Sequence, residues 1–160
     1  MQRVPITKEG YERIRDELKR LKTTERREVA HDLEVARGHG DLKENADYDA
    51  ARERQGMLEA MIRDLEDVMA RAEVIDTSKL SGDRVVFGAT VKLYNVDTDE
   101  ETSVRIVGEV EADIKAGLIS VTSPLARSLI GKREDDAVVV NTPGGRKNYE
   151  VLEILFEQSA

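Results

Sequence analysis

Four carboxylates lie within nine residues of one another in the first third of the chain: Asp41, Glu44, Asp47 and Asp49. Where such a segment is helical, carboxylates three residues apart project from the same side. Grouped carboxylates repel one another in water unless a cation lies between them, and hard divalent cations such as Mg²⁺ prefer oxygen ligands. Asp41 and Glu44 are therefore candidate metal ligands and candidate catalytic residues.

The same two residues also fit a purely structural interpretation. Asp-x-x-Glu just before an amphipathic helix is the pattern of a capping box, with Asp41 as the cap and Glu44 three residues on. Spacing alone favours this interpretation, although a cap needs only one carboxylate oxygen and both roles are compatible. On spacing alone, Arg37 and Arg52 are solvated ion-pairing residues, and His39 is a loop residue.

This acidic segment lies between two predicted helices in residues 7–76. Thr7 is a candidate N-cap with Glu9 in the first turn, and Gly38-His39-Gly40 breaks the helical pattern. The first seam contains Tyr11, Ile14, Leu18, Leu21, Val29, Leu33 and Ala36; the second contains Tyr48, Ala51, Gln55, Leu58, Ile62, Leu65, Met69 and Ala72. Spacings of three and four predict a coiled-coil seam. Between Leu21 and Val29 two steps of four are needed, which is a stutter in a heptad pattern.

Two such helices joined by a short turn form an antiparallel hairpin. Each arm has about 30 residues, so at about 1.5 Å per residue the hairpin would be roughly 45 Å long. A finger of that length has too little core to be a compact fold. We therefore expect it to project from a second domain and to carry its chemistry at the tip.

The remainder of the chain, from residue 77 onward, is strand-like. Short runs rich in β-branched residues alternate with turn signals, which predicts a mostly antiparallel sheet. The expected strands are residues 84–87, 90–94, 103–107, 118–121, 137–140 and 149–156, with turns at residues 97–100 and 142–145.

One short helix is expected within this sheet domain. Ser123 can cap it, Pro124 suits its first position, and Gly131 lies just past its end. The predicted fold class is therefore α+β, with a helical hairpin in residues 1–76 and a small sheet domain in residues 77–160.

Composition limits the partners that we expect. The 160-residue chain has a net charge of −8, and 36% of its residues are charged. Duplex binding depends largely on Lys and Arg neutralising phosphates, so the main partner of an acidic chain is expected to be a protein. The chain has no cysteine, which excludes disulfides and thiolate metal sites. We expect no signal peptide or membrane span, and a cytoplasmic location.

Several sequence blocks resemble the GreA/GreB family of bacterial transcript cleavage factors. At the tip the chain reads Gly38-x-Gly40-Asp41-Leu42-Lys43-Glu44-Asn45-Ala46-x-Tyr48; further matching blocks are Val85 to Val91, Arg105 to Gly108, Ile119 to Lys132 and Val138 to Gly145. The resemblance covers nearly the whole chain. It implies a coiled coil that enters the secondary channel of RNA polymerase and an FKBP-like C-terminal domain that grips the channel rim.

The resemblance also implies a function and its residues. The protein would stimulate the polymerase's own endonucleolytic cleavage of backtracked RNA, without being an enzyme itself. Asp41 and Glu44 would help to hold the second Mg²⁺ of the polymerase site and to orient the attacking water, with no metal bound in the free protein. Arg37 and Arg52 would meet the 3′ end of the nascent RNA. The factor is expected to act as a monomer.

The short helix is the expected docking element. Ser123, Pro124 and Arg127 are the candidate polymerase-docking residues, whereas Leu125, Leu129 and Ile130 are expected to cover the sheet. One rival function keeps the same fold and dock: an anti-cleavage plug of the Gfh kind, which has a more acidic tip. Two further rivals are a prolyl isomerase and a helical adaptor without catalytic contribution. An aromatic-lined pocket for the isomerase is difficult to build from two Phe and no Trp.

Overall fold

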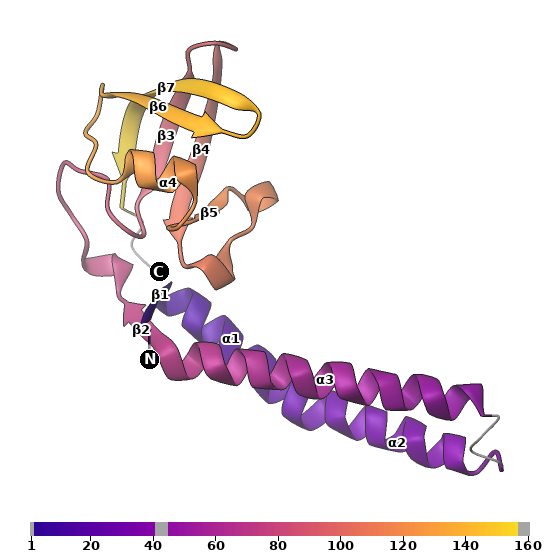
Figure 1. The fold of residues 1–160 in the computed structure, drawn as a ribbon. Helices are drawn as coiled ribbons and strands as arrows, with labels where there is room; N and C mark the ends of the chain where they lie inside the picture. The colour runs from indigo at the N-terminus through magenta and orange to yellow at the C-terminus, as the bar shows by residue number, and fades with distance from the viewer. Residues whose placement is uncertain (1, 41–44, 157–160) are drawn as a thin grey trace. The chain divides into compact units, whose positions relative to one another are not determined.

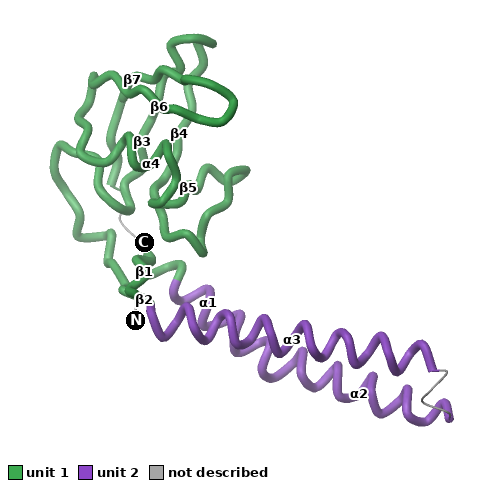
Figure 2. Tube along the Cα trace, viewed as in Figure 1, with its two compact units in different colours: residues 1–10, 72–160 green, residues 11–71 purple. Residues whose placement is uncertain are grey.

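The computed structural model describes residues 2–40 and 45–156. The chain divides into two compact units: residues 11–71 form one, and residues 1–10 together with 72–160 form the other (Figure 2). The sequence pattern predicts a single boundary near residue 76. In the structure, the first ten residues instead belong to the same unit as the C-terminal half. Taken together, the helical unit and the sheet unit fit the predicted α+β class.

The hairpin unit consists of two antiparallel arms (Figure 1). Helices α1 (Lys8–Arg20) and α2 (Arg26–Arg37) form the first arm, and α3 (Ala46–Arg71) forms the second. At about 1.5 Å per residue, the 26 residues of α3 extend roughly 39 Å. The buried residues between the arms are Leu21, Val29, Leu33, Ala51, Leu58 and Ile62, with Leu18, Tyr48 and Leu65 packed against them. All belong to the predicted seam, so the coiled-coil prediction is confirmed.

A π-helical segment, Leu21–Glu25, joins α1 to α2 at the predicted stutter. Val29 lies eight positions after Leu21, and at about 3.6 residues per turn eight positions complete about 2.2 turns. A regular α-helix would rotate Val29 away from the seam. The wider π turn takes up the extra residue, and both Leu21 and Val29 are buried.

The residues on either side of the hairpin in the sequence form a short parallel sheet. Strand β1 (Val4–Thr7) pairs with β2 (Ala72–Ile75), which follows α3 directly. The prediction that helix continues to residue 76 is therefore wrong at its end, because residues 72–75 pair with a distant strand. Thr7 caps α1 as predicted: its hydroxyl oxygen accepts a hydrogen bond of 3.1 Å from the backbone N–H of Gly10.

Glu111 fixes the start of the chain to the C-terminal half. Its carboxylate accepts hydrogen bonds from the backbone N–H of Thr7 at 3.1 Å, from the hydroxyl of Thr7, and from the backbone N–H of Gly108 at 2.7 Å. The residue is 8% exposed. A buried carboxylate is tolerated where several donors satisfy it, as these three do.

A five-stranded sheet forms the body of this unit. Its strands are β3 (Thr90–Asn95), β4 (Glu100–Val107), β5 (Leu118–Ser120), β6 (Ala137–Thr142) and β7 (Gly145–Leu155), in the order β5-β4-β3-β7-β6. Only the pairing of β4 with β5 is parallel. The strand expected at residues 84–87 does not form. There Arg84 makes one isolated bridge to Arg133, and the backbone of Val85 bonds to residues 131 and 132.

Helix α4 (Pro124–Leu129) is the predicted short helix. The Ser123 hydroxyl oxygen accepts a 3.2 Å hydrogen bond from the N–H of Ala126, and Pro124 occupies the first turn. Ala126 and Leu129 are buried in the sheet core. Ile130 is 42% exposed, so its expected place over the sheet is wrong. Ala126 fills that role, because it lies one turn before Ile130 on the inner side.

Candidate functional site at the hairpin tip

The first arm ends where its sequence stops supporting a helix. The N–H of Gly38 bonds to the carbonyl oxygens of Glu34 and Val35, and the N–H of His39 bonds to that of Ala36 at 3.1 Å. Gly40 has a φ of 103°, a conformation that residues with a Cβ rarely adopt. The predicted break at Gly38-His39-Gly40 is therefore confirmed, and the chain leaves the first arm there.

The second arm begins at Asn45. Its side-chain oxygen accepts a hydrogen bond of 3.1 Å from the N–H of Tyr48, and its backbone oxygen accepts one from Asp49. Asn45 is thus the N-cap of α3. The capping-box interpretation concerns Asp41 and Glu44, which lie outside the described residues. Within the described residues, the cap of α3 is Asn45.

The two candidate catalytic and metal-binding residues, Asp41 and Glu44, lie outside the described residues. Their role stays a prediction. Within residues 2–40 and 45–156, no group of three or more His, Asp or Glu side chains is arranged to hold a metal ion. Asp47 and Asp49 are both on the first turn of α3, where Asp47 is exposed.

The candidate RNA-contacting residues are exposed on both arms near this end. Arg37 is the last residue of α2, and Arg52 lies in the second turn of α3. A guanidinium N–H of Arg52 donates to the side-chain oxygen of Gln55 at 3.3 Å. Both arginines are therefore accessible to a ligand, and neither side chain is buried between the arms.

Sequence reasoning missed one contact across the tip. The Nδ1 atom of His39 lies 3.3 Å from a carboxylate oxygen of Asp47, and both side chains are more than half exposed. The pair joins the end of the first arm to the start of the second. Nothing in the spacing of the two residues indicated it, because the contact depends on how the arms face one another.

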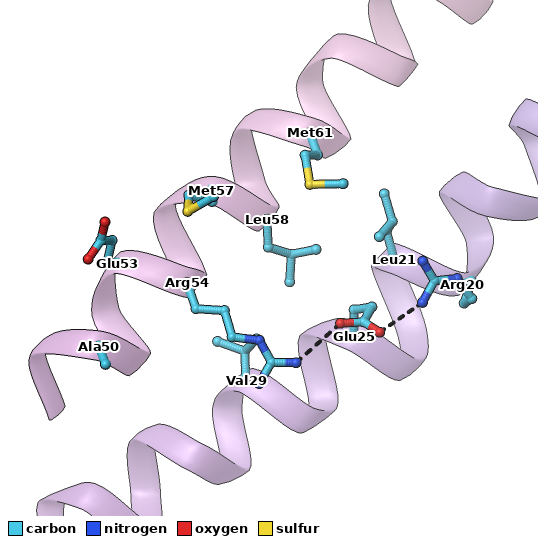
Figure 3. A pocket seen from close by; sticks show the side chains of 10 residues that line it. All are labelled: Arg20, Leu21, Glu25, Val29, Ala50, Glu53, Arg54, Met57, Leu58 and Met61. Atoms are coloured by element: carbon cyan, nitrogen blue, oxygen red, sulfur yellow. Dashed lines mark hydrogen bonds and ion pairs between the residues drawn. The ribbon is translucent and has the colours of Figure 1, made fainter. Parts of the chain in front are cut away.

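Further along the arms, an apolar groove with a charged edge runs between them (Figure 3). Leu21, Leu58 and Met61 are among the residues that line it. Arg54 reaches across from α3 and lies 3.3 Å from Glu25 and 2.7 Å from Asp32. These charged residues were not part of the predicted seam. They lie on the exposed side of the groove, where they favour one register of the two arms.

A second cross-arm pair has a fork geometry. Two guanidinium N–H groups of Arg26 donate to the two carboxylate oxygens of Glu59, at 2.9 and 2.8 Å. These hydrogen bonds lower the pKa of the Glu59 carboxyl below its ordinary value. The pair is exposed, so its contribution to stability is small and sensitive to salt.

Comparison with known proteins decides the family. Residues 4–74 match the family model described as Transcription elongation factor, N-terminal, and residues 80–156 match that described as Transcription elongation factor, GreA/GreB, C-term. The chain belongs to the GreA/GreB family. A relative from Phenylobacterium zucineum, named Transcription elongation factor GreA, is 59% identical over 96% of this chain and 98% of its own length. One of the same name from Anaeromyxobacter is 54% identical over 98% and 94%.

Solved structures with lower identity were also found. GreA factor homolog 1 of Thermus thermophilus is 29% identical, with a TM-score of 0.44, and the match covers 96% of this chain and 99% of the other. A GreA/GreB elongation factor from Nitrosomonas europaea is 20% identical, with a TM-score of 0.42 over 98% and 100%. In this member of the GreA/GreB family, no described helix has an apolar stretch long enough to cross a bilayer.

The family's C-terminal half contains the candidate docking residues. Pro124 is exposed at the start of α4, Arg127 is exposed on its outer side, and Ser123 is half-buried with its hydroxyl oxygen engaged in the helix cap. Two of the three are thus presented to solvent on one short helix. Whether they meet a partner stays a prediction, and the structure gives Ser123 a local role as well.

Proposed function

We propose that this protein enters the secondary channel of RNA polymerase and stimulates the polymerase's own cleavage of backtracked RNA. The observation that carries the proposal is the family match over both halves of the chain. The hairpin supports it: a narrow pair of helices, with Asp41 and Glu44 in the sequence that joins the two arms, suits a channel that a compact domain could not enter. Releasing stalled elongation complexes would be the result.

Asp41 and Glu44 are proposed as ligands of a Mg²⁺ ion shared with the polymerase. Their carboxylate oxygens are ligands of the kind Mg²⁺ prefers, and Mg²⁺ is usually held by one or two carboxylates together with waters and phosphates. When bound, the ion would stabilise charge on the attacking and leaving oxygens of the RNA backbone. The two carboxylates would orient the attacking water. The protein itself supplies no complete active site, so it would not be an enzyme.

The remaining residues divide between RNA and polymerase. Arg37 and Arg52, exposed on opposite arms, would meet the 3′ end of the extruded RNA, since guanidinium groups pair well with phosphates. Ser123, Pro124 and Arg127 would belong to the surface that docks at the rim of the channel. A single copy would occupy the channel, so the factor would act as a monomer in the cytoplasm.

A cleavage assay on stalled complexes tests this function. Backtracked complexes with labelled RNA are incubated with polymerase alone, with the wild-type factor, and with Asp41→Asn and Glu44→Gln variants. We expect the wild type to accelerate cleavage and each variant to lose at least about 100-fold, comparable to removing one transition-state contact. Polymerase binding should be nearly unchanged, because docking is assigned to the other unit.

The matched control is Asp64→Asn, which removes an exposed carboxylate from the middle of α3. It should leave stimulation intact. A double variant, Asp41→Asn with Glu44→Gln, that retains full stimulation would overturn the metal-ligand role. A wild-type factor that slows cleavage would instead identify the anti-cleavage plug, and one that binds without any effect would identify an adaptor.

A further inference from the structure

Two methionines are exposed on one side of the second arm. Met57 and Met61 are 63% and 49% exposed, and they lie four residues apart on α3, so their side chains project from the same side of the helix. Each directly precedes a buried seam residue, Leu58 or Ile62, and therefore lies at the edge of the seam. Both line the apolar groove between the arms. The pair thus borders solvent and the groove at once.

The groove combines apolar side chains with hydrogen-bond donors. The side chain of Met61 extends across it toward Leu21 of the first arm (Figure 3). Arg20 and Arg54 also line the groove, and both pair with Glu25, at 2.8 and 3.3 Å. A thioether packs well against aliphatic side chains, whereas a sulfoxide is polar and its oxygen accepts hydrogen bonds. Oxidation of the sulfur would therefore change the groove from an apolar surface to a polar one.

The thioether is the group of this chain most open to mild oxidation. The chain has no cysteine and no tryptophan, and it has four methionines. A peroxide must reach the sulfur lone pair, so the rate of oxidation follows exposure. Met69, farther along α3, is half-buried. A leucine at residue 57 or 61 would supply similar apolar cover at about the same helix propensity, so the thioether adds chemistry rather than structure.

We propose that Met57 and Met61 form a reversible oxidation site whose oxidant is hydrogen peroxide. The sulfur lone pair attacks one peroxide oxygen, so an S–O bond forms and the O–O bond breaks. The sulfur loses two electrons, and the second oxygen leaves as water after it takes up the proton of the transferred hydroxyl. Thiol-dependent sulfoxide reductases restore the thioether. The hairpin stays folded, because the buried seam residues are not modified.

Peptide mapping measures where the peroxide reacts. Trypsin releases Met57 and Met61 together in residues 55–63 and Met69 in residues 64–71, so mass spectrometry resolves the two regions, and fragment ions resolve the pair. Rates are compared between the folded protein and protein unfolded in urea, where all three sulfurs are equally accessible. On folding, Met57 and Met61 should keep at least about half of the unfolded rate, and Met69 at most about one fifth.

A second measurement follows the groove and the fold. After peroxide treatment, the NMR signals of the Leu21 methyl groups should shift in the wild type and in Met57→Leu, but not in Met61→Leu, which lacks the facing sulfur. Helix content by circular dichroism should stay unchanged. The melting temperature should fall by less than about 5 °C, as for an exposed change. Sulfoxide reductases of both stereospecificities, with a dithiol, should return the Leu21 signals to their original positions.

Several results would overturn the inference. Oxidation of Met69 as fast as the pair would show that exposure does not select the site. A loss of helix content in step with oxidation would show damage to the fold, and sulfoxides that the reductases cannot reduce would show that the change is not reversible. An equal shift of Leu21 in Met61→Leu would exclude the groove as the place that changes. None of these outcomes bears on the proposed function, because neither measurement contains polymerase.

Discussion

Gly10 is a residue whose identity a neighbour dictates. It lies in the first turn of α1, and a Cβ built on it would overlap the carboxylate of Glu111 and lie 2.6 Å from its Cγ. Glu111 cannot move aside freely, because its carboxylate holds three hydrogen bonds to Thr7 and Gly108. The absence of a side chain at residue 10 therefore permits the close approach that fixes the N-terminus.

Substitution of this glycine tests that contact. Gly10→Ala should destabilise the protein by roughly 1–3 kcal/mol, the usual cost of overpacking a buried position. Gly56→Ala is the control, because Gly56 is also helical and a Cβ there would meet no atom within 4 Å. That variant should stabilise by about 0.5–1 kcal/mol. Urea unfolding of both variants measures the difference, and equal effects would refute the role of Glu111.

Residue identities were predictable where the chemistry is local. The caps by Thr7 and Ser123 followed from residue type and position, and both form. The capping pattern at Asp41 and Glu44 lies outside the described residues, whereas Asn45, which no sequence pattern singled out as a cap, caps α3. Asn45 gains a bond to Ala36 that only the folded hairpin provides. The partners of Glu111 depend on folding in the same way.

At the scale of elements, the first arm carries one residue more than a regular heptad would allow. Leu21 and Val29 both face α3, and the π segment between them absorbs the extra residue. Removal of one residue here would shorten the spacing between the two from eight positions to seven, which is a regular heptad step. The π turn thus accommodates one inserted residue, and the seam continues on both sides of it.

Deletion of Thr24, an exposed residue of the π segment, should therefore be tolerated. We expect a regular α-helix through this region and a free energy of unfolding within about 1 kcal/mol of the wild type, as for an exposed change. Deletion of Gly56 in the regular α3 is the control. It would rotate Leu58 and Ile62 out of the seam, at several kcal/mol, because each buried aliphatic side chain contributes roughly 2–5 kcal/mol. Thermal unfolding followed by circular dichroism compares the two, and similar losses would contradict the interpretation.

The cross-arm pair of Arg26 and Glu59 makes a small contribution to stability that depends on pH. The hydrogen bonds from Arg26 lower the pKa of Glu59 below its ordinary value. A carboxyl with a lowered folded-state pKa stabilises the fold above its ordinary pKa, and that contribution is lost as the pH falls through the folded-state value. An NMR titration should show the lowered pKa in the wild type and its return toward the ordinary value in Arg26→Gln. An unchanged Glu59 titration in that variant would show that the pair does not form in solution.

Element prediction succeeded where the period of apolar residues is regular. The seam residues and the strands β3, β4, β6 and β7 follow directly from spacings of three and four or from β-branched runs. Prediction failed at residues 72–75, which continue the helical spacing but pair with β1. It also failed at residues 84–87, where the strand-like composition reflects packing in the core and no strand forms. Both failures involve partners that are distant in the sequence, and the local spacing of apolar residues cannot indicate such partners.

At the scale of the whole molecule, the proposed metal site is incomplete without a partner. Asp41 and Glu44 supply only two carboxylates, and Mg²⁺ usually keeps several waters and completes its coordination with phosphates. Calorimetric titration of the free protein with Mg²⁺ should therefore detect no binding tighter than about 1 mM, the weak end of the range for protein cation sites. Micromolar binding that disappears in the Asp41→Asn variant would contradict the shared-site proposal.

The contact between Thr7 and Glu111 also orders events on the ribosome. The two residues are 104 positions apart, so at about 5–20 residues per second Thr7 is synthesised roughly 5–20 s before its partner. Residues 11–71 form a hairpin from contacts between neighbouring helices, which close quickly. The hairpin can therefore form on the nascent chain before Glu111, the partner of Thr7, has been synthesised.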